Sequence, residues 1–450
     1  MISILIVGAG KSSTYLIDTL LKHTQKKNYK NRDSNWRVVV ADSDEQNLIQ
    51  KTQHYPNAEI AVLDINSTQQ RQKLVKAADI VVSLMPPTLH ILLAKDCLQF
   101  KKNLITSSYA SDEMRELDQK VKDAGLMFMC EMGLDPGIDH MSASHIFNSV
   151  RKVASSITSF KSYCGGLIAP ESDTNPWHYK FSWNPKNIIN AGKGGAYYLE
   201  QGVKVHLEYE KLFANNKSIY CDGVGELAYY ANRDSLSYID LYQLHESKDF
   251  MRATLRHPEF CIGWNALIKL GATDTEKQIN TDNCSFKDWI KHISDYEDTN
   301  ISVQDHVWNK LGLSDNRIKN MIEWLDIFSD KTIDNGQMTS GDILLNILSE
   351  KWKMEDEDKD MVVMQHEIEY LFKGATNKLV SGLVVKGEDS NFSAMAKTVG
   401  LPMAILTELL MNKMIVAPTG VLIPTMPAIY RPILKRLEKY NIGFTESITM

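Results

Sequence analysis

A glycine-rich turn that directly follows an apolar run at the amino terminus constrains this chain more than any other feature. Residues 2–7 include five aliphatic side chains and lead straight into Gly8-Ala9-Gly10-Lys11-Ser12-Ser13. This order predicts a buried strand that turns at once into a helix, with glycines where a cofactor pyrophosphate approaches the backbone. The third glycine of the usual pattern is replaced by Ser13, so the motif alone is weak. An ordinary βαβ start without a ligand stays open as the alternative.

The next predicted strand strengthens the reading of the turn as a dinucleotide site. It covers 36–41 and ends in Asp42, the acidic residue expected to accept a hydrogen bond from the adenosine ribose 2′-hydroxyl. The spacing from Gly8 to Asp42 exceeds the roughly 20 residues of the usual pattern, and we attribute the excess to a loop insertion at 23–35. Only Ser43-Asp44-Glu45 follow, without an Arg. A 2′-phosphate would therefore meet acidic groups, and we expect NAD to be preferred, with NADP left open.

Strand and helix patterns alternate up to about residue 130, which predicts a doubly wound parallel sheet. The later strands are expected at 60–63, 79–84, 103–106 and 126–130. Open α/β sheets bind ligands outside the carboxyl ends of their strands. The polar residues expected to line that crevice are Asp42, Asp64, Ser83, Tyr109 and Glu131. The residues expected to hold the cofactor are Gly8, Gly10, Lys11, Ser12, Ser13, Asp42, Asp64, Ile65 and Ser83.

Past residue 134 the sequence pattern changes. Short strand-like pieces with Gly, Pro and aromatic clusters give way to charged helical periodicity, and strand-like and then helical patterns return near the end. The doublet Gly165-Gly166 beside aromatics suggests that the backbone approaches a ligand or another chain closely. We expect an α/β fold with a Rossmann-type sheet, an inserted mixed α+β substrate domain and a helical lobe. The domains are expected at 1–134 with 395–450 packing back on it, at 135–240 with 360–394, and at 241–359.

Composition excludes several classes of protein. The 450 residues carry 50 Lys and Arg against 56 Asp and Glu, a formal net charge of −6 without a long basic or acidic block. This balance disfavours nucleic acid and membrane surfaces as partners. The six cysteines include no CxxC pair, which favours free thiols in a reducing compartment and gives no readable metal site. The first strand begins at once and no apolar run reaches the ~18 residues of a membrane helix, with 397–411 interpreted as a packed amphipathic helix. We expect a cytoplasmic protein.

Long strings further along the chain are more specific than the glycine turn. These strings are Gly133–His140, Ser162–Gly166, Asn175–Trp183, Asn232–Ser235, Thr254–Arg256, Trp324–Asp330 and Ser393–Lys397. By these strings the chain resembles saccharopine dehydrogenase of the glutamate-forming type, also called saccharopine reductase, over nearly its whole length. The resemblance implies a dinucleotide domain to which the carboxyl terminus returns, an inserted mixed domain and a helical lobe.

The resemblance also implies a reaction. Saccharopine is a secondary amine that joins the terminal carbon of lysine to the nitrogen of glutamate, and the family oxidises it by hydride transfer to a nicotinamide. The imine is then hydrolysed to glutamate and 2-aminoadipate 6-semialdehyde. Because the cofactor performs the redox step, the protein must hold a tricarboxylate, deprotonate the amine and exchange protons with water at the imine carbon. The direction, towards synthesis or breakdown of lysine, stays open.

Carried over by motif, the resemblance implies that Asp135 and Cys164 are the polar residues nearest the reacting nitrogen, with Tyr109 beside them. The residues implied to hold the substrate are Ser108, Tyr109, Arg233, Thr254 and Arg256. Each catalytic assignment has a structural alternative. Asp135 precedes a Pro and could cap a turn, while Cys164 could be a small buried apolar residue. Arg233 could pair with Asp234 on the surface.

Two other functions stay open at this point. A related imine reductase, such as a carboxynorspermidine synthase, would share the fold and the imine chemistry, and a non-catalytic protein could merely sense the dinucleotide. The block from Cys164 to Trp183 and the two candidate arginines favour saccharopine. The intact set of Tyr109, Asp135, Cys164 and Arg233 disfavours the sensor. We expect a small-molecule substrate, no nucleic acid and no membrane, with a homodimer left open.

Overall fold

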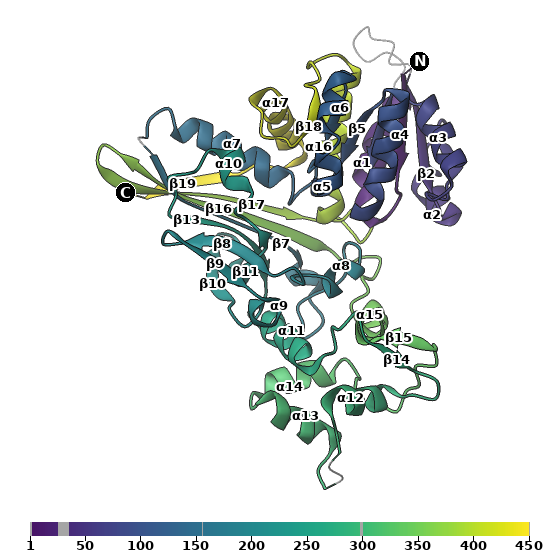
Figure 1. The fold of residues 1–450 in the computed structure, drawn as a ribbon, viewed down its shortest axis with the longest axis vertical. Helices are drawn as coiled ribbons and strands as arrows, with labels where there is room; N and C mark the ends of the chain where they lie inside the picture. Colours follow the sequence, from purple (N-terminus) through teal and green to yellow (C-terminus); the bar gives the residue numbers. More distant parts are fainter. Residues whose placement is uncertain (1, 26–35, 155, 298–299, 450) are drawn as a thin grey trace. The chain divides into compact units, whose positions relative to one another are not determined.

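The computed structural model describes residues 2–25, 36–154, 156–297 and 300–449 (Figure 1). The chain divides into two compact units, Met1–Ile157 with Tyr370–Met450, and Thr158–Glu369. Most of the loop insertion predicted at 23–35 lies outside the described residues, although α1 (Thr14–Gln25) is helical to its end. The expected domain boundaries, and the roles expected for the three domains, stay predictions.

The first unit is built on a seven-stranded parallel sheet, which confirms the predicted doubly wound fold. The strands lie in the order β18-β6-β5-β4-β1-β2-β3, and every pair is parallel. Their bounds are β1 (Ile2–Val7), β2 (Trp36–Asp42), β3 (Glu59–Val62), β4 (Ile80–Ser83), β5 (Asn103–Thr106), β6 (Met127–Met129) and β18 (Gly420–Leu422). The direction of strand order reverses between β1 and β4, so the glycine turn after β1 lies at the topological switch point where such sheets bind ligands.

Helices follow the strands as the alternation predicted, and the inner strands are apolar on both faces because helices cover both faces of such a sheet. The helices of this unit are α1 (Thr14–Gln25), α2 (Glu45–Thr52), α3 (Thr68–Ala77), α4 (His90–Phe100), α5 (Asp112–Arg115), α6 (Asp118–Asp123), α7 (Ile138–Val150), α16 (Ala394–Met411) and α17 (Pro427–Leu437), with 3-10 turns η1 (Lys11–Ser13), η2 (Pro87–Leu89) and η4 (Glu438–Tyr440). Val38, Val40, Val81 and Val82 have no exposed surface.

Segments from the carboxyl terminus complete the first unit. β18 pairs with β6 as the last strand of the parallel sheet, with Gly420 opposite Met127. Two further strands, β17 (Ala375–Lys386) and β19 (Thr445–Thr449), pair antiparallel. α17 packs against α7 and α16 packs against α1. A Cβ added at Gly400 of α16 would lie 2.8 Å from the Leu16 nitrogen, so the glycine permits this close approach of the two helices.

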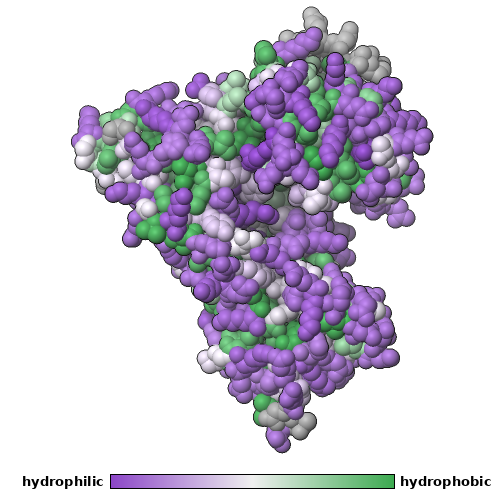
Figure 2. Space-filling view, viewed as in Figure 1, coloured by the Kyte–Doolittle hydropathy of each residue, from purple (hydrophilic) through white to green (hydrophobic). Residues whose placement is uncertain are grey.

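Helix α16 differs from the expectation. At 18 residues and a mean hydropathy of 1.3, Ala394–Met411 is long and apolar enough to cross a membrane, although no such run was expected. Most of its side chains are buried within the structure, so it is a core helix rather than an amphipathic one. Most of the molecular face in Figure 2 is hydrophilic, with hydrophobic residues scattered between.

The second unit contains a mixed sheet. Strands β10 (Lys217–Cys221), β11 (Gly225–Ala231), β13 (Asp249–Arg256), β7 (Ser156–Ile168) and β16 (Asp360–Phe372) are neighbours in that order. β13 pairs parallel with β7 and antiparallel with β11. Three shorter strands, β8 (Ala196–Glu200), β9 (Val203–Leu207) and β12 (Arg233–Asp234), attach through β8 to β13. The mixed sheet agrees with the predicted fold class.

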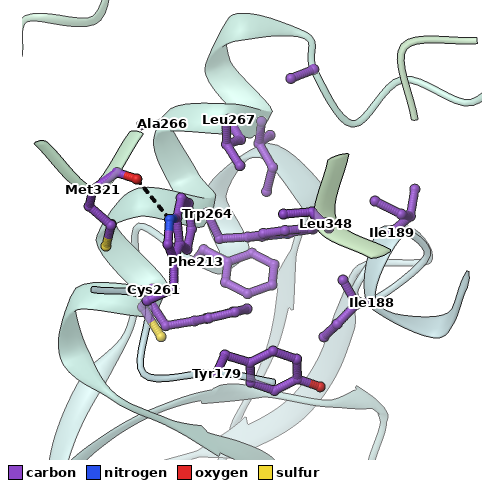
Figure 3. Packing of buried hydrophobic residues seen from close by; sticks show 14 of the residues in the cluster. Tyr179, Ile188, Ile189, Phe213, Cys261, Trp264, Ala266, Leu267, Met321 and Leu348 are labelled. Atoms are coloured by element: carbon purple, nitrogen blue, oxygen red, sulfur yellow. Dashed lines mark hydrogen bonds between the residues drawn. The ribbon is translucent and has the colours of Figure 1, made fainter. Parts of the chain in front are cut away.

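Helices and a large aromatic core complete the second unit. The helices are α8 (Lys186–Ile189), α9 (Tyr209–Leu212), α10 (Tyr238–Tyr242), α11 (Pro258–Leu270), α12 (Phe286–Ser294), α13 (Val303–Leu311), α14 (Asn316–Glu323) and α15 (Ser340–Lys351), with a 3-10 turn η3 (Pro170–Ser172) and a small hairpin of β14 (Gln278–Asn280) and β15 (Gln337–Thr339). Figure 3 shows Tyr179, Phe213 and Trp264 in this core, with a dashed line that ends at the carbonyl oxygen of Met321. Trp177 Nε1 donates a hydrogen bond to this carbonyl at 2.8 Å. Trp177 and Tyr179 from the recognised string are therefore core residues.

Candidate active site

The glycine turn leaves its backbone accessible at one position and crowded at another. The Gly8 nitrogen donates to the Ala41 carbonyl at 2.8 Å, with φ +103, and a Cβ there would lie 3.0 Å from the Leu84 carbonyl group. Gly10 is exposed, and nothing lies within 4 Å of a Cβ added to it. Ser13, which replaces the third glycine, is buried, and its Oγ donates to the Gly10 carbonyl at 2.7 Å. The serine therefore closes the turn, while the open face of Gly10 leaves room for a phosphate.

Asp42 is tied to this turn at the end of β2. Its Oδ2 accepts a hydrogen bond from the Ala9 nitrogen at 2.6 Å, and its Oδ1 accepts one from the Asp44 nitrogen at 3.1 Å. A carboxylate has about four acceptor positions, so Asp42 keeps capacity for a ribose hydroxyl. The half-buried carboxylate thus lies beside the turn, where the sequence predicted it.

The remaining predicted cofactor residues lie at the carboxyl edge of the same sheet. Lys11 is exposed and Ser12 is half-buried in η1. Asp64 is exposed just beyond β3, and its Oδ1 accepts from the Asn66 nitrogen at 2.9 Å. Ile65 is buried, and its carbonyl accepts from Arg71 Nη1 at 2.8 Å. Asp64 and Ile65 thus organise the loop after β3, and their contact with a cofactor stays a prediction.

A buried histidine that the sequence reasoning missed links two predicted site residues. The Oγ of Ser83, at the carboxyl end of β4, lies 2.9 Å from His90 Nδ1. His90 Nε2 lies 2.9 Å from Ser108 Oγ. Ser83 has no exposed surface, His90 is 3% exposed, and Ser108 is half-buried. Burial lowers the pKa of His90 to about 4, so its imidazole is neutral near pH 7. The available signal was its position as the first residue of the helix that follows β4.

The structure brings together two of the three predicted catalytic residues. The Tyr109 hydroxyl donates to Asp135 Oδ1 at 3.1 Å, and both side chains are half-buried. Asp135 lies in a tight turn, in which the Gly133 nitrogen donates to the Pro136 carbonyl at 3.0 Å. The Gly137 nitrogen donates to Asp139 Oδ1 at 2.6 Å, so the carboxylate of Asp139 satisfies the N-cap nitrogen of α7.

A buried acidic residue anchors the loop that carries Tyr109. Glu131, like Ser83, was expected to line the crevice, but neither residue has exposed surface, so that expectation was wrong for both. Glu131 Oε2 lies 2.8 Å from Nε2 of the equally buried His140, and its Oε1 accepts from the Ala110 nitrogen at 3.1 Å. The Glu131 nitrogen donates to the Ser108 carbonyl at 3.1 Å. Glu131 and His140 therefore lie beneath the site and hold its two loops together.

Cys164 and Thr254 lie side by side in the second unit. They are partners in the parallel register of β7 and β13, and Cys164 is 6% exposed. A Cβ at the next residue, Gly165, would lie 2.5 Å from the Leu255 carbonyl oxygen of β13. Gly165 is thus required by the contact of two strands of the same sheet. The expected approach of this glycine to a ligand or another chain stays a prediction.

Arg256, at the end of β13, is a buried cation with few partners. It is 4% exposed, its Nη1 donates to the Leu255 carbonyl at 2.7 Å, and its guanidinium lies over the rings of Tyr179 and Phe260 at 5.2 and 5.5 Å. Among the described residues its Nε has no hydrogen-bond partner and no carboxylate pairs with it. Burial raises the pKa of Tyr230 to about 12 although Arg256 lowers it, so this tyrosine supplies no counter-charge near pH 7. Such a site suits an anionic ligand.

The second candidate arginine has a different environment. Arg233 is exposed on the short strand β12, opposite Ala196 of β8, with φ +51. Its role towards a substrate stays a prediction. The buried arginine near it is Arg252, which is 2% exposed and lies over the Tyr238 ring at 4.7 Å. Sequence reasoning missed Arg252 because a lone cation in a strand gives no sign of burial.

Comparison with known proteins gives matches over both units. A model of the saccharopine dehydrogenase NADP binding domain matches residues 4–129, and a model of the saccharopine dehydrogenase C-terminal domain matches residues 133–442. The Saccharomyces cerevisiae saccharopine dehydrogenase (NADP(+), L-glutamate-forming) is 33% identical over 99% of this chain and 98% of that protein. The corresponding protein of Pyricularia oryzae is 32% identical over 99% of each chain.

Longer relatives and a solved structure also match. The mitochondrial alpha-aminoadipic semialdehyde synthase of Mus musculus is 32% identical over 99% of this chain, which spans only 48% of that protein. The apo structure of the histidine-tagged Saccharomyces cerevisiae saccharopine dehydrogenase (L-Glu forming) superposes with a TM-score of 0.87 at 31% identity, and covers 100% of both chains. The fold described above is therefore the fold of that enzyme.

Proposed function

The chain belongs to the saccharopine dehydrogenase family, and on that premise we propose that it oxidises the secondary amine of saccharopine with a nicotinamide cofactor and hydrolyses the imine to L-glutamate and 2-aminoadipate 6-semialdehyde. The hydrogen-bonded pair of Tyr109 and Asp135 carries this proposal. The pair follows strands of the dinucleotide-type sheet at their carboxyl ends, where a ligand of such a sheet binds. A carboxylate held by a phenol can accept and return a proton there.

The glycine turn fits a nicotinamide dinucleotide. The exposed, uncrowded backbone of Gly10 opens the start of η1 to a phosphate, and Asp42 lies beside it for the ribose. When bound, the nicotinamide supplies the hydride acceptor. We propose NAD as the preferred cofactor, because the carboxylates at 42, 44 and 45 would repel a 2′-phosphate. The NADP(+) in the names of the fungal relatives and of the matching domain model favours the other cofactor, so this preference rests on Asp42 and its neighbours alone.

Asp135 is proposed to handle the protons of both half-reactions. Its carboxylate takes the proton from the substrate ammonium before hydride transfer and later protonates the departing amine. The Tyr109 hydroxyl donates to Asp135 Oδ1 at 3.1 Å, which orients the carboxylate. Cys164 is proposed as a supporting proton-handling group with a smaller contribution, because a neutral thiol is a weak hydrogen-bond partner.

The three substrate carboxylates need fixed positive or hydrogen-bonding groups. Arg256 fits this role because its buried guanidinium has an unpartnered Nε and no counter-ion among the described residues. A guanidinium can meet a carboxylate with two parallel hydrogen bonds, which an ammonium cannot. Thr254, Ser108 and Arg233 are proposed to hold the remaining carboxylate oxygens.

Turnover by the purified protein tests the proposed function. Saccharopine with NAD or NADP should increase the absorbance of the reduced nicotinamide, and an independent assay should detect one glutamate for each nicotinamide reduced. Asp135→Asn, which keeps the size of the side chain, serves as the matched negative control. Dinucleotide binding without turnover of saccharopine would contradict the proposal and favour a sensor. Turnover of a carboxynorspermidine-type imine in place of saccharopine would move the assignment to the related reductase.

We also propose a cytoplasmic location and a homodimer. All six cysteines are free thiols, as in proteins of reducing compartments. Fractionation of the source cells tests the location, and light scattering of the purified protein tests the dimer against a mass of 51.0 kDa for one chain.

A further inference from the structure

The two hydrogen bonds that link Ser83, His90 and Ser108 determine which of these side chains donates a hydrogen and which accepts one. The two serines contact different ring nitrogens of His90. Ser83 Oγ lies 2.9 Å from Nδ1 and Ser108 Oγ lies 2.9 Å from Nε2, so each hydroxyl makes one hydrogen bond with the imidazole. A neutral imidazole has one N–H donor and one lone-pair acceptor. One serine must therefore donate to His90 and the other must accept from it. Which serine does which decides what the outer hydroxyl can offer to a ligand.

The burial of Ser83 settles this direction. Ser83 has no exposed surface, and among the described residues its hydroxyl has His90 Nδ1 as its only hydrogen-bond partner. If Nδ1 carried the proton, the hydroxyl hydrogen of Ser83 would be buried without an acceptor, which is unfavourable because the hydrogen bond to water is lost on folding and not replaced. The favoured arrangement has Ser83 donating to Nδ1, so the ring proton is on Nε2. The neutral state that this arrangement needs follows from burial, which lowers the pKa of His90 to about 4.

The consequence lies at Ser108. Its Oγ accepts the Nε2 proton of His90, and among the described residues its own hydroxyl hydrogen has no acceptor. Ser108 is half-buried and therefore reachable by a ligand, and its backbone is fixed because its carbonyl accepts from the Glu131 nitrogen at 3.1 Å. The free hydrogen is thus presented in a defined direction. A carboxylate oxygen can accept it, whereas a ligand ammonium has no lone pair to do so.

We propose that His90 is a positioning residue that fixes Ser108 as a hydrogen-bond donor and so selects a substrate carboxylate at that place. The inference rests on the proposed function, because it takes Ser108 to contact the substrate. It assigns a substrate-specificity role to a histidine that touches neither the substrate nor the cofactor. Ser83 contributes to the same role, because its buried hydroxyl determines the tautomer of the His90 ring.

A spectroscopic measurement tests the tautomer without any assay of activity. In long-range proton–nitrogen spectra of protein with 15N-labelled histidine, the signals of His90 are identified among the 12 histidines by their loss in His90→Gln. The exposed His245 gives the matched control variant, His245→Gln, which should remove a different signal only. A proton on Nε2 and none on Nδ1 is the expected result. A proton on Nδ1, or on both nitrogens at pH 7, would overturn the inference.

A double-mutant cycle tests the consequence for the substrate. Ser108→Ala should raise the KM for saccharopine about tenfold, as expected for one hydrogen bond to a charged group, with little change in kcat or in the Kd for the dinucleotide. His90→Gln should raise KM in the wild-type background and add nothing when Ser108 is already alanine. Additive effects would show that His90 acts independently of Ser108 and would contradict the inference.

Two controls keep the outcomes distinct. Where His90→Gln does not fold, Ser83→Ala replaces it in the cycle and should show the same loss of effect in the Ser108→Ala background. A Ser83→Ala variant that loses dinucleotide affinity but keeps its KM for saccharopine would assign Ser83 to the cofactor and overturn the inference. Absence of saccharopine turnover in the wild type would instead refute the proposed function, and the tautomer would still be decided by the spectrum.

Discussion

Replacing Arg256 by methionine should make the unliganded protein more stable while it abolishes tight substrate binding. The guanidinium is 4% exposed and has no carboxylate partner among the described residues, so folding takes a charge out of water without neutralising it. The effective penalty for such an ion is several kcal/mol. A trade-off of this kind is expected where a cation is held ready for an anionic ligand.

The magnitude follows from the contacts of Arg256. The hydrogen bond to the Leu255 carbonyl recovers about 1.5–3 kcal/mol, and the rings of Tyr179 and Phe260 recover about 0.5–2 kcal/mol each. A methionine would keep the apolar contacts with both rings and would leave no charge to be taken out of water. Replacement of buried ions by apolar residues of similar volume is neutral or stabilising by about 1–4 kcal/mol. We expect the free energy of unfolding of Arg256→Met to rise by about 1–3 kcal/mol.

Urea unfolding followed by tryptophan fluorescence measures this change. The unfolding midpoint of Arg256→Met should move to higher urea with an unchanged slope, while the exposed Arg317→Met should shift stability by less than about 0.5 kcal/mol. Saccharopine should raise the midpoint of the wild type but not that of Arg256→Met, and the KM for saccharopine should rise by the equivalent of about 2–5 kcal/mol. A lower midpoint for Arg256→Met would refute the reasoning, because it would identify the guanidinium as a structural group.

The other predictions concern the proton relay, the turn beneath it and the cofactor. Asp135→Asn should lower kcat by about 10²–10⁴-fold with the Kd for the dinucleotide unchanged; a rate near wild type with an unaltered pH profile would reduce Asp135 to a turn residue. Gly137→Ala, with φ +149 and a Cβ 2.1 Å from the Gly133 carbonyl oxygen, should destabilise the protein by at least ~2 kcal/mol; Gly374→Ala, with φ +84 but nothing within 4 Å, should cost only about 1–2 kcal/mol, and equal losses at both sites would disprove the crowding. The ratio of kcat/KM for NAD over NADP should exceed one and fall in Asp42→Ser, and a wild-type preference for NADP would refute the role given to Asp42.

Much of the first unit could be predicted because its signals are local. Buried parallel strands are short apolar runs, and the order of strand, glycine turn and helix lies within consecutive residues, so β5 was predicted with its observed bounds. The meeting of Tyr109 and Asp135 followed from the recognised string and from their places after two neighbouring strands.

What could not be predicted depends on which side chains face inward where distant segments meet. The bridge of His90 between two serines requires the relative positions of β4, α4 and the loop after β5, which no periodicity encodes. The contact of Gly165 with Leu255 depends on the register of two strands far apart in the sequence. Glu131 was predicted at the correct edge of the sheet, but its burial was not predicted, because the burial of a carboxylate depends on a partner, here His140.

The first unit is built from two segments that lie far apart in the sequence, and this arrangement determines the order in which the chain can fold during synthesis. Met1–Ile157 leaves the ribosome well before α16 and β18, so the face of α1 that α16 covers and the edge of β6 that β18 fills stay exposed until residues 394–422 are made. Exposed apolar surface and unpaired strand edges on a growing chain favour aggregation and chaperone binding. Ribosome-bound chains arrested before residue 394 should therefore be cleaved by protease in the amino-terminal segment, and chains long enough to expose residue 450 should be protected. A dinucleotide could then stabilise the first unit only after residues 394–422 are made, which makes cofactor supply a late influence on the yield of the folded chain.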